Sequence, residues 1–252
     1  MATSEHRGQH HLQNKVAPGL PEGLLASAGE IHYLWWYMQG SIMNSEVRQR
    51  LRNGWGFCER HAWIALLVES SFRHHFLMGP AMVYEDVFGL AVKVIEAKGP
   101  MKNLQILAGL RERGRCLLCD MVPKKDREED IRPDLLLRGR DAGELRRLAE
   151  MTRAYWEQAV CGRCLGDETW PCCRKHLMED AGTGRIKDIS KHRTMLHQLK
   201  KHITAYSNGF RWELRGTATL EDTAALISIV GWCSGWRPLL NLMGIKMKGT
   251  ER

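Results

Sequence analysis

Apolar residues recur along most of the chain at the three- and four-residue spacing of α-helices. Val83, Val87 and Val94, for example, would share one face of a helix over residues 81–97. No alternating apolar and polar run is long enough to predict a strand, although a short hairpin is possible around the cysteines. The pattern predicts an all-α multi-helix bundle. The expected helices cover residues 29–42, 46–52, 59–77, 81–97, 101–113, 141–159, 186–207 and 220–231.

Helix breakers and capping residues set several of these boundaries. Gly79 and Pro80 should separate two helices, with Pro80 in the first turn of the second one. The charged segment 123–140 contains two prolines and is expected to be a loop. Asp141 and Glu144 then resemble a capping box at the start of the next helix.

Tryptophan is abundant, with nine in 252 residues. Large aromatic side chains contribute strongly to buried cores, so most of them should be buried. Those near the C-terminus could instead form an exposed interaction surface, although a core position is favoured for these as well. The tryptophans predicted in the core are Trp35, Trp36, Trp63 and Trp156, and the C-terminal ones are Trp212, Trp232 and Trp236.

The chain divides into four parts by composition and motif position. Residues 1–25 are polar and are expected to be a flexible N-terminal arm. Residues 26–115 form an N-terminal helical half, residues 116–240 a C-terminal helical half, and residues 241–252 a basic tail. No apolar run reaches the roughly 20 residues of a membrane span, and the N-terminus lacks an apolar signal core. These features predict a cytoplasmic protein.

The formal net charge of +8 raises the expectation of an anionic partner. The helix over residues 186–207 is amphipathic and basic. It could bind nucleic acid through phosphate contacts or dock on an acidic protein, or it could simply expose a solvated charged face. Oligomeric state stays open. The candidate anion-binding residues on this helix are Lys187, Lys191, Arg193, Lys200 and Lys201.

Four short pairs of cysteine and histidine residues are the most informative motifs. Two are C-x-x-C and two are C-x-x-H, and each lies at an expected helix end or turn. Thiolate and neutral imidazole are the ligands that tetrahedral zinc prefers, and one ion needs two such pairs. In a reducing compartment, clustered cysteines are typical of metal or redox sites borne on loops. The pairs are Cys58/His61, Cys116/Cys119, Cys161/Cys164 and Cys173/His176.

The strongest signal is local. Cys161, Cys164, Cys173 and His176 fall within 16 residues, which suits one closed zinc site, with Cys172 as an alternative to Cys173.

The two remaining pairs, Cys58/His61 and Cys116/Cys119, would complete a second site if the intervening helices fold back on each other. In the other possible arrangement, Cys116/Cys119 joins Cys173/His176, and Cys161/Cys164 joins Cys58/His61. The first arrangement is favoured because it keeps one site local and so costs less loop-closure entropy.

Part of the chain resembles a family of uncharacterised prokaryotic proteins, classed as a domain of unknown function. The resemblance spans roughly residues 30–235, through NSEVRQRLRNGWGFCERHAW, MGPAMVYEDVFGLAVKVI, a C-x-x-C and a later C-x-x-H-L. It implies metal binding and a helical fold, and no activity. Family members usually begin with a C-x-x-C, whereas residues 1–57 contain no cysteine here and Cys161/Cys164 is an additional pair. The family's first site is therefore either lost or completed by other residues.

Three functions are compatible with these motifs. The favoured one is a helical binding or accessory protein stabilised by one or two closed zinc sites. An iron–sulfur or dithiol redox protein is the alternative. A metalloenzyme with an open site near Cys58 and His61, using Glu85 or Asp86, is a further one, although carboxylates in a first helical turn are common for structural reasons. The chain lacks the P-loop, dinucleotide-binding, H-E-x-x-H and G-x-S-x-G motifs, so an enzyme is the less favoured class.

Overall fold

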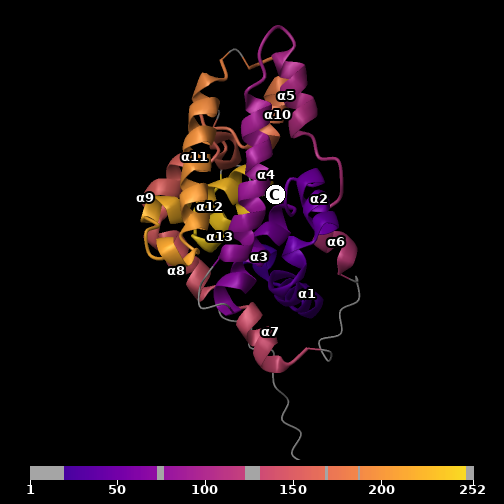
Figure 1. The fold of residues 1–252 in the computed structure, drawn as a ribbon, viewed down its shortest axis with the longest axis vertical. Helices are drawn as coiled ribbons and strands as arrows, with labels where there is room; N and C mark the ends of the chain where they lie inside the picture. Colours follow the sequence, from indigo (N-terminus) through magenta and orange to yellow (C-terminus); the bar gives the residue numbers. More distant parts are fainter. Residues whose placement is uncertain (1–19, 73–76, 123–130, 168–169, 187, 248–252) are drawn as a thin grey trace, which may run out of the picture.

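The computed structural model describes residues 20–72, 77–122, 131–167, 170–186 and 188–247, which contain helices and no strand. The predicted all-α multi-helix fold is confirmed, and the possible hairpin near the cysteines is absent from these residues (Figure 1). The α-helices are α1 (Ala28–Gln39), α2 (Ser45–Asn53), α3 (Glu59–Phe72), α4 (Met78–Ile95), α5 (Lys102–Leu110), α6 (Leu117–Met121), α7 (Pro133–Gly139), α8 (Gly143–Met151), α9 (Arg153–Trp156), α10 (Arg174–Gly182), α11 (Ser190–Asn208), α12 (Leu220–Ser234) and α13 (Arg237–Leu242). The 3-10 helices are η1 (Glu22–Leu24), η2 (Ser41–Met43), η4 (Glu157–Ala159), η5 (Gly162–Leu165) and η6 (Trp212–Leu214).

Two helices, α3 and α12, form the centre of the core. Residues 61–70 of α3 and 224–234 of α12 are buried on every side, because both helices are apolar all round. They pack against each other, and the indole nitrogen of Trp63 donates a 2.8 Å hydrogen bond to the carbonyl of Gly235. The core is therefore built from segments more than 150 residues apart, which ties the two halves of the chain together.

Other helices cover this centre. The long helices α4 and α11 lie side by side against α12, while α5 packs on α10 at one end of the molecule (Figure 1). At the other end, α1 and α7 pack on α3. The helix α2 lies against α4 and also contacts α6. This arrangement brings the start of α3 close to α6, although the two are far apart in sequence.

The predicted helix boundaries on both sides of Gly79 and Pro80 are wrong. The break expected at Gly79 and Pro80 comes earlier, since α4 begins at Met78 and both residues are buried within its first turn. Proline is compatible with a first turn because its missing N–H has no helical partner there. The preceding helix ends at Phe72, and residues 73–76 lie outside the described part.

The region expected to be a loop contains a helix. Pro133 occupies the first position of α7, which suits its fixed φ angle, and the expected loop residues 123–130 lie outside the described part. The next helix begins at Gly143 without a capping box; Asp141 instead accepts a 2.8 Å hydrogen bond from the amide of Gly143. It is also interrupted at Thr152, so the single expected helix is α8, α9 and η4.

The tryptophan predictions are partly correct. Trp63 and Trp156 are fully buried, as are Trp232 and Trp236 near the C-terminus. Trp36 was expected in the core but is 58% exposed, because α1 turns that side toward solvent, where its indole donates to His32. Trp35 is half-buried, and Trp212 is the exposed one of the three C-terminal tryptophans.

The sequence predicts a flexible arm over residues 1–25 and a basic tail over residues 241–252. Residues 1–19 of the predicted arm and 248–252 of the tail lie outside the described part. Within the described part, Glu22–Leu24 forms η1 and Leu24 is fully buried, so packing begins before residue 25. No helix among the described residues is long and apolar enough to cross a membrane.

Candidate metal centres

The first ligand pair lies on a tight turn between α2 and α3. Trp55 (φ 58°) and Gly56 (φ 88°) both have left-handed backbone conformations. A Cβ atom at Gly56 would also come within 2.9 Å of the Tyr84 ring, so glycine is required there. The carbonyl of Cys58 accepts the 2.9 Å bond from Ala62 that opens α3. His61 therefore follows within the first turn, on the same side as the Cys58 sulfur.

The second pair lies at the start of α6. Cys116 is the N-cap residue of this five-residue helix and its carbonyl accepts a 3.2 Å bond from the amide of Asp120. Cys119 follows one turn later, which places both sulfurs on one side. Arg50 of α2 holds the helix by donating a 2.7 Å hydrogen bond to the carboxylate of Asp120.

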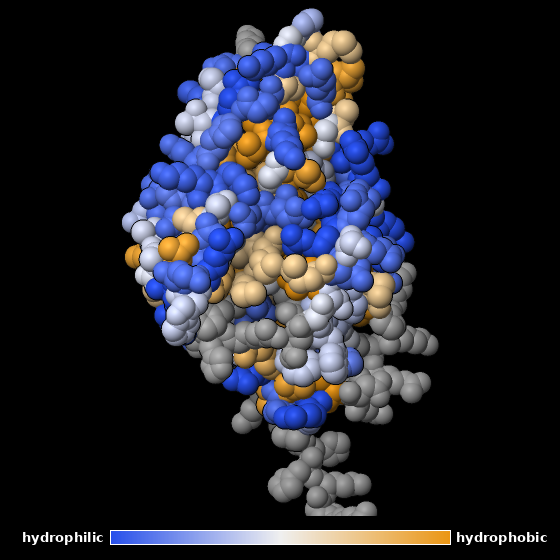
Figure 2. Space-filling model, viewed as in Figure 1, coloured by the Kyte–Doolittle hydropathy of each residue, from blue (hydrophilic) through white to orange (hydrophobic). Residues whose placement is uncertain are grey.

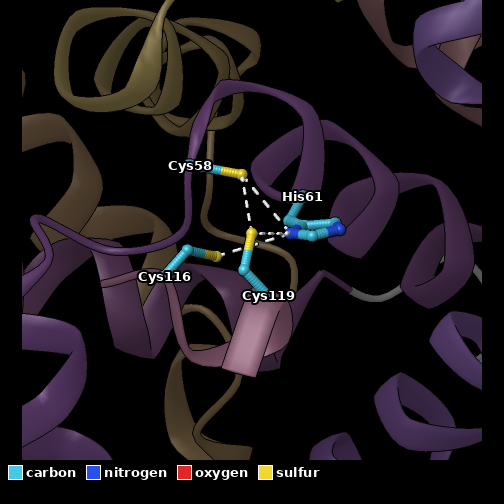
Figure 3. Close-up of side chains that lie close together, drawn as sticks. All are labelled: Cys58, His61, Cys116 and Cys119. Carbon is cyan, nitrogen blue, oxygen red and sulfur yellow. Dashed lines mark hydrogen bonds between the residues drawn. The ribbon is translucent and has the colours of Figure 1, made fainter. Parts of the chain in front are cut away.

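These two pairs converge (Figure 3). Nδ1 of His61 lies 3.3 Å from the sulfur of Cys58, 3.4 Å from that of Cys116 and 3.3 Å from that of Cys119. The sulfurs of Cys58 and Cys119 are 3.9 Å apart. Tetrahedral zinc, with Zn–S near 2.3 Å and Zn–N near 2.0 Å, requires separations of about 3.8 Å between sulfurs and about 3.5 Å between sulfur and nitrogen. The donor set fits one such ion.

A buried carboxylate orients the histidine. Nε2 of His61 donates a 2.7 Å hydrogen bond to Oε1 of Glu30, which also pairs with Arg60. A histidine that binds a metal is neutral; because a carboxylate can only accept, its remaining proton would then lie on Nε2, and the lone pair of Nδ1 would point at the three sulfurs. Such a carboxylate–histidine pair is a common outer contact of protein zinc sites. Glu30 was not predicted from the sequence.

The contacts also change the pKa values of the cluster. Burial on its own would lower the pKa of His61, but hydrogen bonds to Cys116 and Glu30 raise it to about 9. The hydrogen bond from Cys58 lowers the pKa of the Cys116 thiol to about 3, and the same bond, with burial, raises that of Cys58. Burial opposes ionisation of Glu30, yet hydrogen bonds with His61 and Arg60 hold its pKa well below the usual range. The cluster thus contains one thiol, Cys116, that ionises easily, and other protons that a bound cation could displace.

A second cluster forms from the local motif. Cys161 precedes η5, Cys164 lies within it, Cys173 is the N-cap residue of α10 and His176 follows on its first turn. Nδ1 of His176 lies 3.1 Å from the sulfur of Cys161, 3.6 Å from that of Cys164 and 3.4 Å from that of Cys173. The sulfurs of Cys164 and Cys173 are 3.8 Å apart. These separations also fit tetrahedral zinc.

The geometry favours one side of each of two alternatives that the sequence leaves open. Cys173, not Cys172, contributes the third sulfur, and the Cys172 sulfur lies 3.8 Å from the carboxylate of Asp180. The pairs combine in the local arrangement, with Cys58/His61 next to Cys116/Cys119. The C-x-x-H near the N-terminus is therefore completed by a later C-x-x-C, instead of one that precedes it.

One buried arginine connects the two regions. Arg174, directly after Cys173, is 1% exposed and donates 2.8 Å hydrogen bonds to the carbonyls of Cys233 and Leu110. It also pairs with Glu112 and lies over the ring of Trp55, 5.4 Å from its centroid. The segment 110–116 and the turn at Trp55, which carry ligands of the first cluster, are thus held by a residue of the second. Sequence reasoning missed Arg174 because it sits among other basic residues.

The predicted anion-binding residues of α11 do not form one free surface. Lys200 pairs with Glu85 at 3.2 Å and Arg193 with Glu96 at 3.3 Å. Lys191 and Lys201 are exposed, and Lys187 lies outside the described part. The ion pairs make part of this basic helix a packing surface against α4.

The carboxylates considered for an open metal site lie elsewhere. Glu85 also accepts a 2.7 Å hydrogen bond from the hydroxyl of Thr204, so it faces α11. Asp86 pairs with Arg52 at 2.8 Å and with Arg48 at 3.5 Å, both from α2. Neither belongs to the group of ligands around Cys58 and His61.

The fold and the site define a helical protein with two Cys3His clusters, each able to hold a metal ion. Comparisons of the chain with protein-family models, with curated proteins and with solved structures found no match.

Proposed function

We propose that each cluster holds one zinc ion and that the chain is a zinc-stabilised helical binding or accessory protein. The observation that carries this proposal is the first cluster, where segments some 60 residues apart place three sulfurs and one imidazole nitrogen at the separations of tetrahedral zinc. Such agreement between distant segments is not expected of free thiols. The resemblance to a family of uncharacterised prokaryotic proteins, which implies metal binding, remains a prediction.

The donor sets favour zinc over an iron–sulfur cluster. Each contains three thiolates and one imidazole, a common zinc set, whereas iron–sulfur clusters are usually held by four cysteines. Four protein ligands also leave no open coordination position, which is typical of structural and not catalytic zinc. The first ion would fasten α6 to the start of α3, and the second would fasten η5 to α10.

A binding role rests on charge and on donor sets that leave no open coordination position. The net charge of +8 suits an anionic partner, either nucleic acid or an acidic protein. Lys191 and Lys201 are exposed cations of α11 that such a partner could contact.

Metal analysis of the full chain tests the proposal. Protein purified without tags or chelators should contain two zinc ions per chain and be colourless. A brown protein with iron and acid-labile sulfide would identify the redox alternative. One tightly held and one freely exchangeable zinc would favour a metalloenzyme with an open site. Protein that is fully folded and metal-free would overturn all three metal-bound forms and leave the dithiol redox alternative.

A further inference from the structure

A cavity of about 640 Å³ opens among α2, α4, the end of α5 and the connector that leads to α6. It lies apart from the sulfur atoms of both clusters, none of which lines it. The helices α2, α4 and α5 lie on the face seen in Figure 1, and Figure 2 shows that much of this face is hydrophilic. Small-molecule sites typically have volumes of about 300–1,000 Å³, so the cavity has the size of one.

Positive charge dominates its lining. Of the two carboxylates there, Asp86 accepts bonds of 2.8 Å and 2.9 Å from Arg52, and Glu85 pairs with Lys200. These four charges balance one another. Three more cations remain, because among the described residues no acidic side chain pairs with Lys93, Arg111 or Arg113.

The backbone that carries the two arginines is fixed. The indole of Trp55 donates a 3.2 Å hydrogen bond to the carbonyl of Arg111, and the amide of Arg113 donates a 2.7 Å bond to the carbonyl of Asn53. Both arginines line the cavity, whereas Glu112 between them pairs with Arg174. Three residues after Arg113, Cys116 anchors the connector in the first cluster. The cations are therefore presented from a held segment.

The remaining lining is apolar and leaves space. Trp55, Leu90 and Val94 contribute apolar surface, and a Cβ atom added at Gly89 would meet no atom within 4 Å. A ligand with anionic groups at one end and an apolar or aromatic group at the other would match both parts.

We propose that this cavity binds a small, multiply phosphorylated molecule, with its phosphates on Lys93, Arg111 and Arg113. Arginine pairs with phosphate oxygens through two parallel hydrogen bonds, which suits closely spaced phosphates. A long nucleic acid fits less well, since Lys93, Arg111 and Arg113 gather at one cavity, and two of the α11 cations, Arg193 and Lys200, are paired with acids. This site is separate from the proposed zinc sites.

Calorimetric titration of the full, metal-loaded chain with ATP and with inorganic tripolyphosphate at physiological salt tests the proposal. Both should bind, ATP more tightly because of its base. The triple variant K93A, R111A and R113A should bind at least tenfold more weakly. The triple variant R146A, R211A and R215A removes the same charge from exposed positions outside the cavity and should bind within twofold of the unchanged chain.

A variant that changes no charge tests the cavity independently, in case the triple variant K93A, R111A and R113A misfolds. Gly89→Leu fills the cavity from a helical position and should weaken ATP binding at least tenfold, with unchanged helix content and zinc content. The proposal is overturned if neither probe binds, if both triples weaken binding equally, or if a single-stranded oligonucleotide binds more tightly than ATP and loses affinity in both triples.

Discussion

Glu30 and His61 form a 2.7 Å hydrogen bond that joins a helix cap to a metal ligand. The other oxygen of Glu30 accepts a 2.8 Å bond from the backbone amide of Ser27, which completes the capping box of α1. One buried carboxylate thus fixes both the start of α1 and the ring orientation of His61. Through it, the first cluster connects α1 to α3 and α6.

Glu30→Gln should weaken zinc binding at the first cluster by about 10–100-fold, because the amide is uncharged and a weaker acceptor for the imidazole N–H. The rate and midpoint of zinc transfer to a coloured chelator measure this. One of the two ions should be released at lower chelator concentration, while the second keeps its original affinity. Glu150→Gln, an exposed carboxylate on α8, is the matched control and should change neither. Unchanged release from the Glu30 variant would contradict the role assigned to this carboxylate.

Cys173→Ser should reduce zinc content from two ions per chain to one, whereas the neighbouring Cys172→Ser should leave two. The reason is that the Cys173 sulfur lies in the second cluster and that of Cys172 faces Asp180. Metal analysis of the two purified variants gives the answer directly. Equal loss in both would mean that the two adjacent thiols exchange as ligands.

The ligand pairs could be predicted from sequence because each C-x-x-C or C-x-x-H is a local spacing that a turn or helix start converts into convergent side chains. Glu30 could not, since its contact with His61 spans 31 positions and depends on how α1 packs on α3. Trp36 is a case in which a local pattern gave a wrong prediction. Its apolar neighbours in sequence predict burial, but the packing of α1 leaves Trp36 in solvent. Long-range packing, not local pattern, decides both cases.

Removal of the first zinc should expose the backbone of α6 before that of the core. A helix of five residues cannot hold itself together, and the pair Cys116 and Cys119 joins α6 to the start of α3, in addition to the Arg50–Asp120 ion pair and two buried leucines of α6. Cys119→Ser should therefore raise hydrogen exchange in residues 117–121 strongly, while α12 stays protected. The short helix α7, which carries no ligand, should be unaffected. Mass-spectrometric exchange measures this; uniform deprotection would show that the ion supports the whole fold.

Arg174→Met should lower the free energy of unfolding by about 3 kcal/mol or more, because it leaves the carbonyls of Cys233 and Leu110 buried without a donor. Urea denaturation of the metal-loaded protein measures the change. The exposed neighbour Lys175→Met is the matched control, with an expected effect within about 0.5 kcal/mol. Similar losses of unfolding free energy in the two variants would contradict the role of Arg174 as a connection between the clusters.

Asp222 should make α12 sensitive to acid. Burial would raise its pKa, but hydrogen bonds from the Thr219 amide and hydroxyl and a 2.7 Å contact with Nδ1 of His202 lower it. A carboxylate with a lowered pKa stabilises the fold above its unfolded pKa of about 3.8, and this contribution is lost as pH falls through the folded value.

Asp222→Asn should therefore cost about 1–2 kcal/mol of unfolding free energy at pH 7, as for loss of a helix cap. The difference from the unchanged chain should shrink below about pH 4, where the native carboxylate also becomes neutral. Acid release of metal affects both proteins alike and cancels in the difference. Glu221→Gln, whose side chain is 53% exposed and 3.3 Å from His202, should cost less than about 0.5 kcal/mol. A difference for Asp222→Asn that stays constant from pH 7 to pH 3 would mean that side-chain shape, and not the charge on Asp222, stabilises the start of α12.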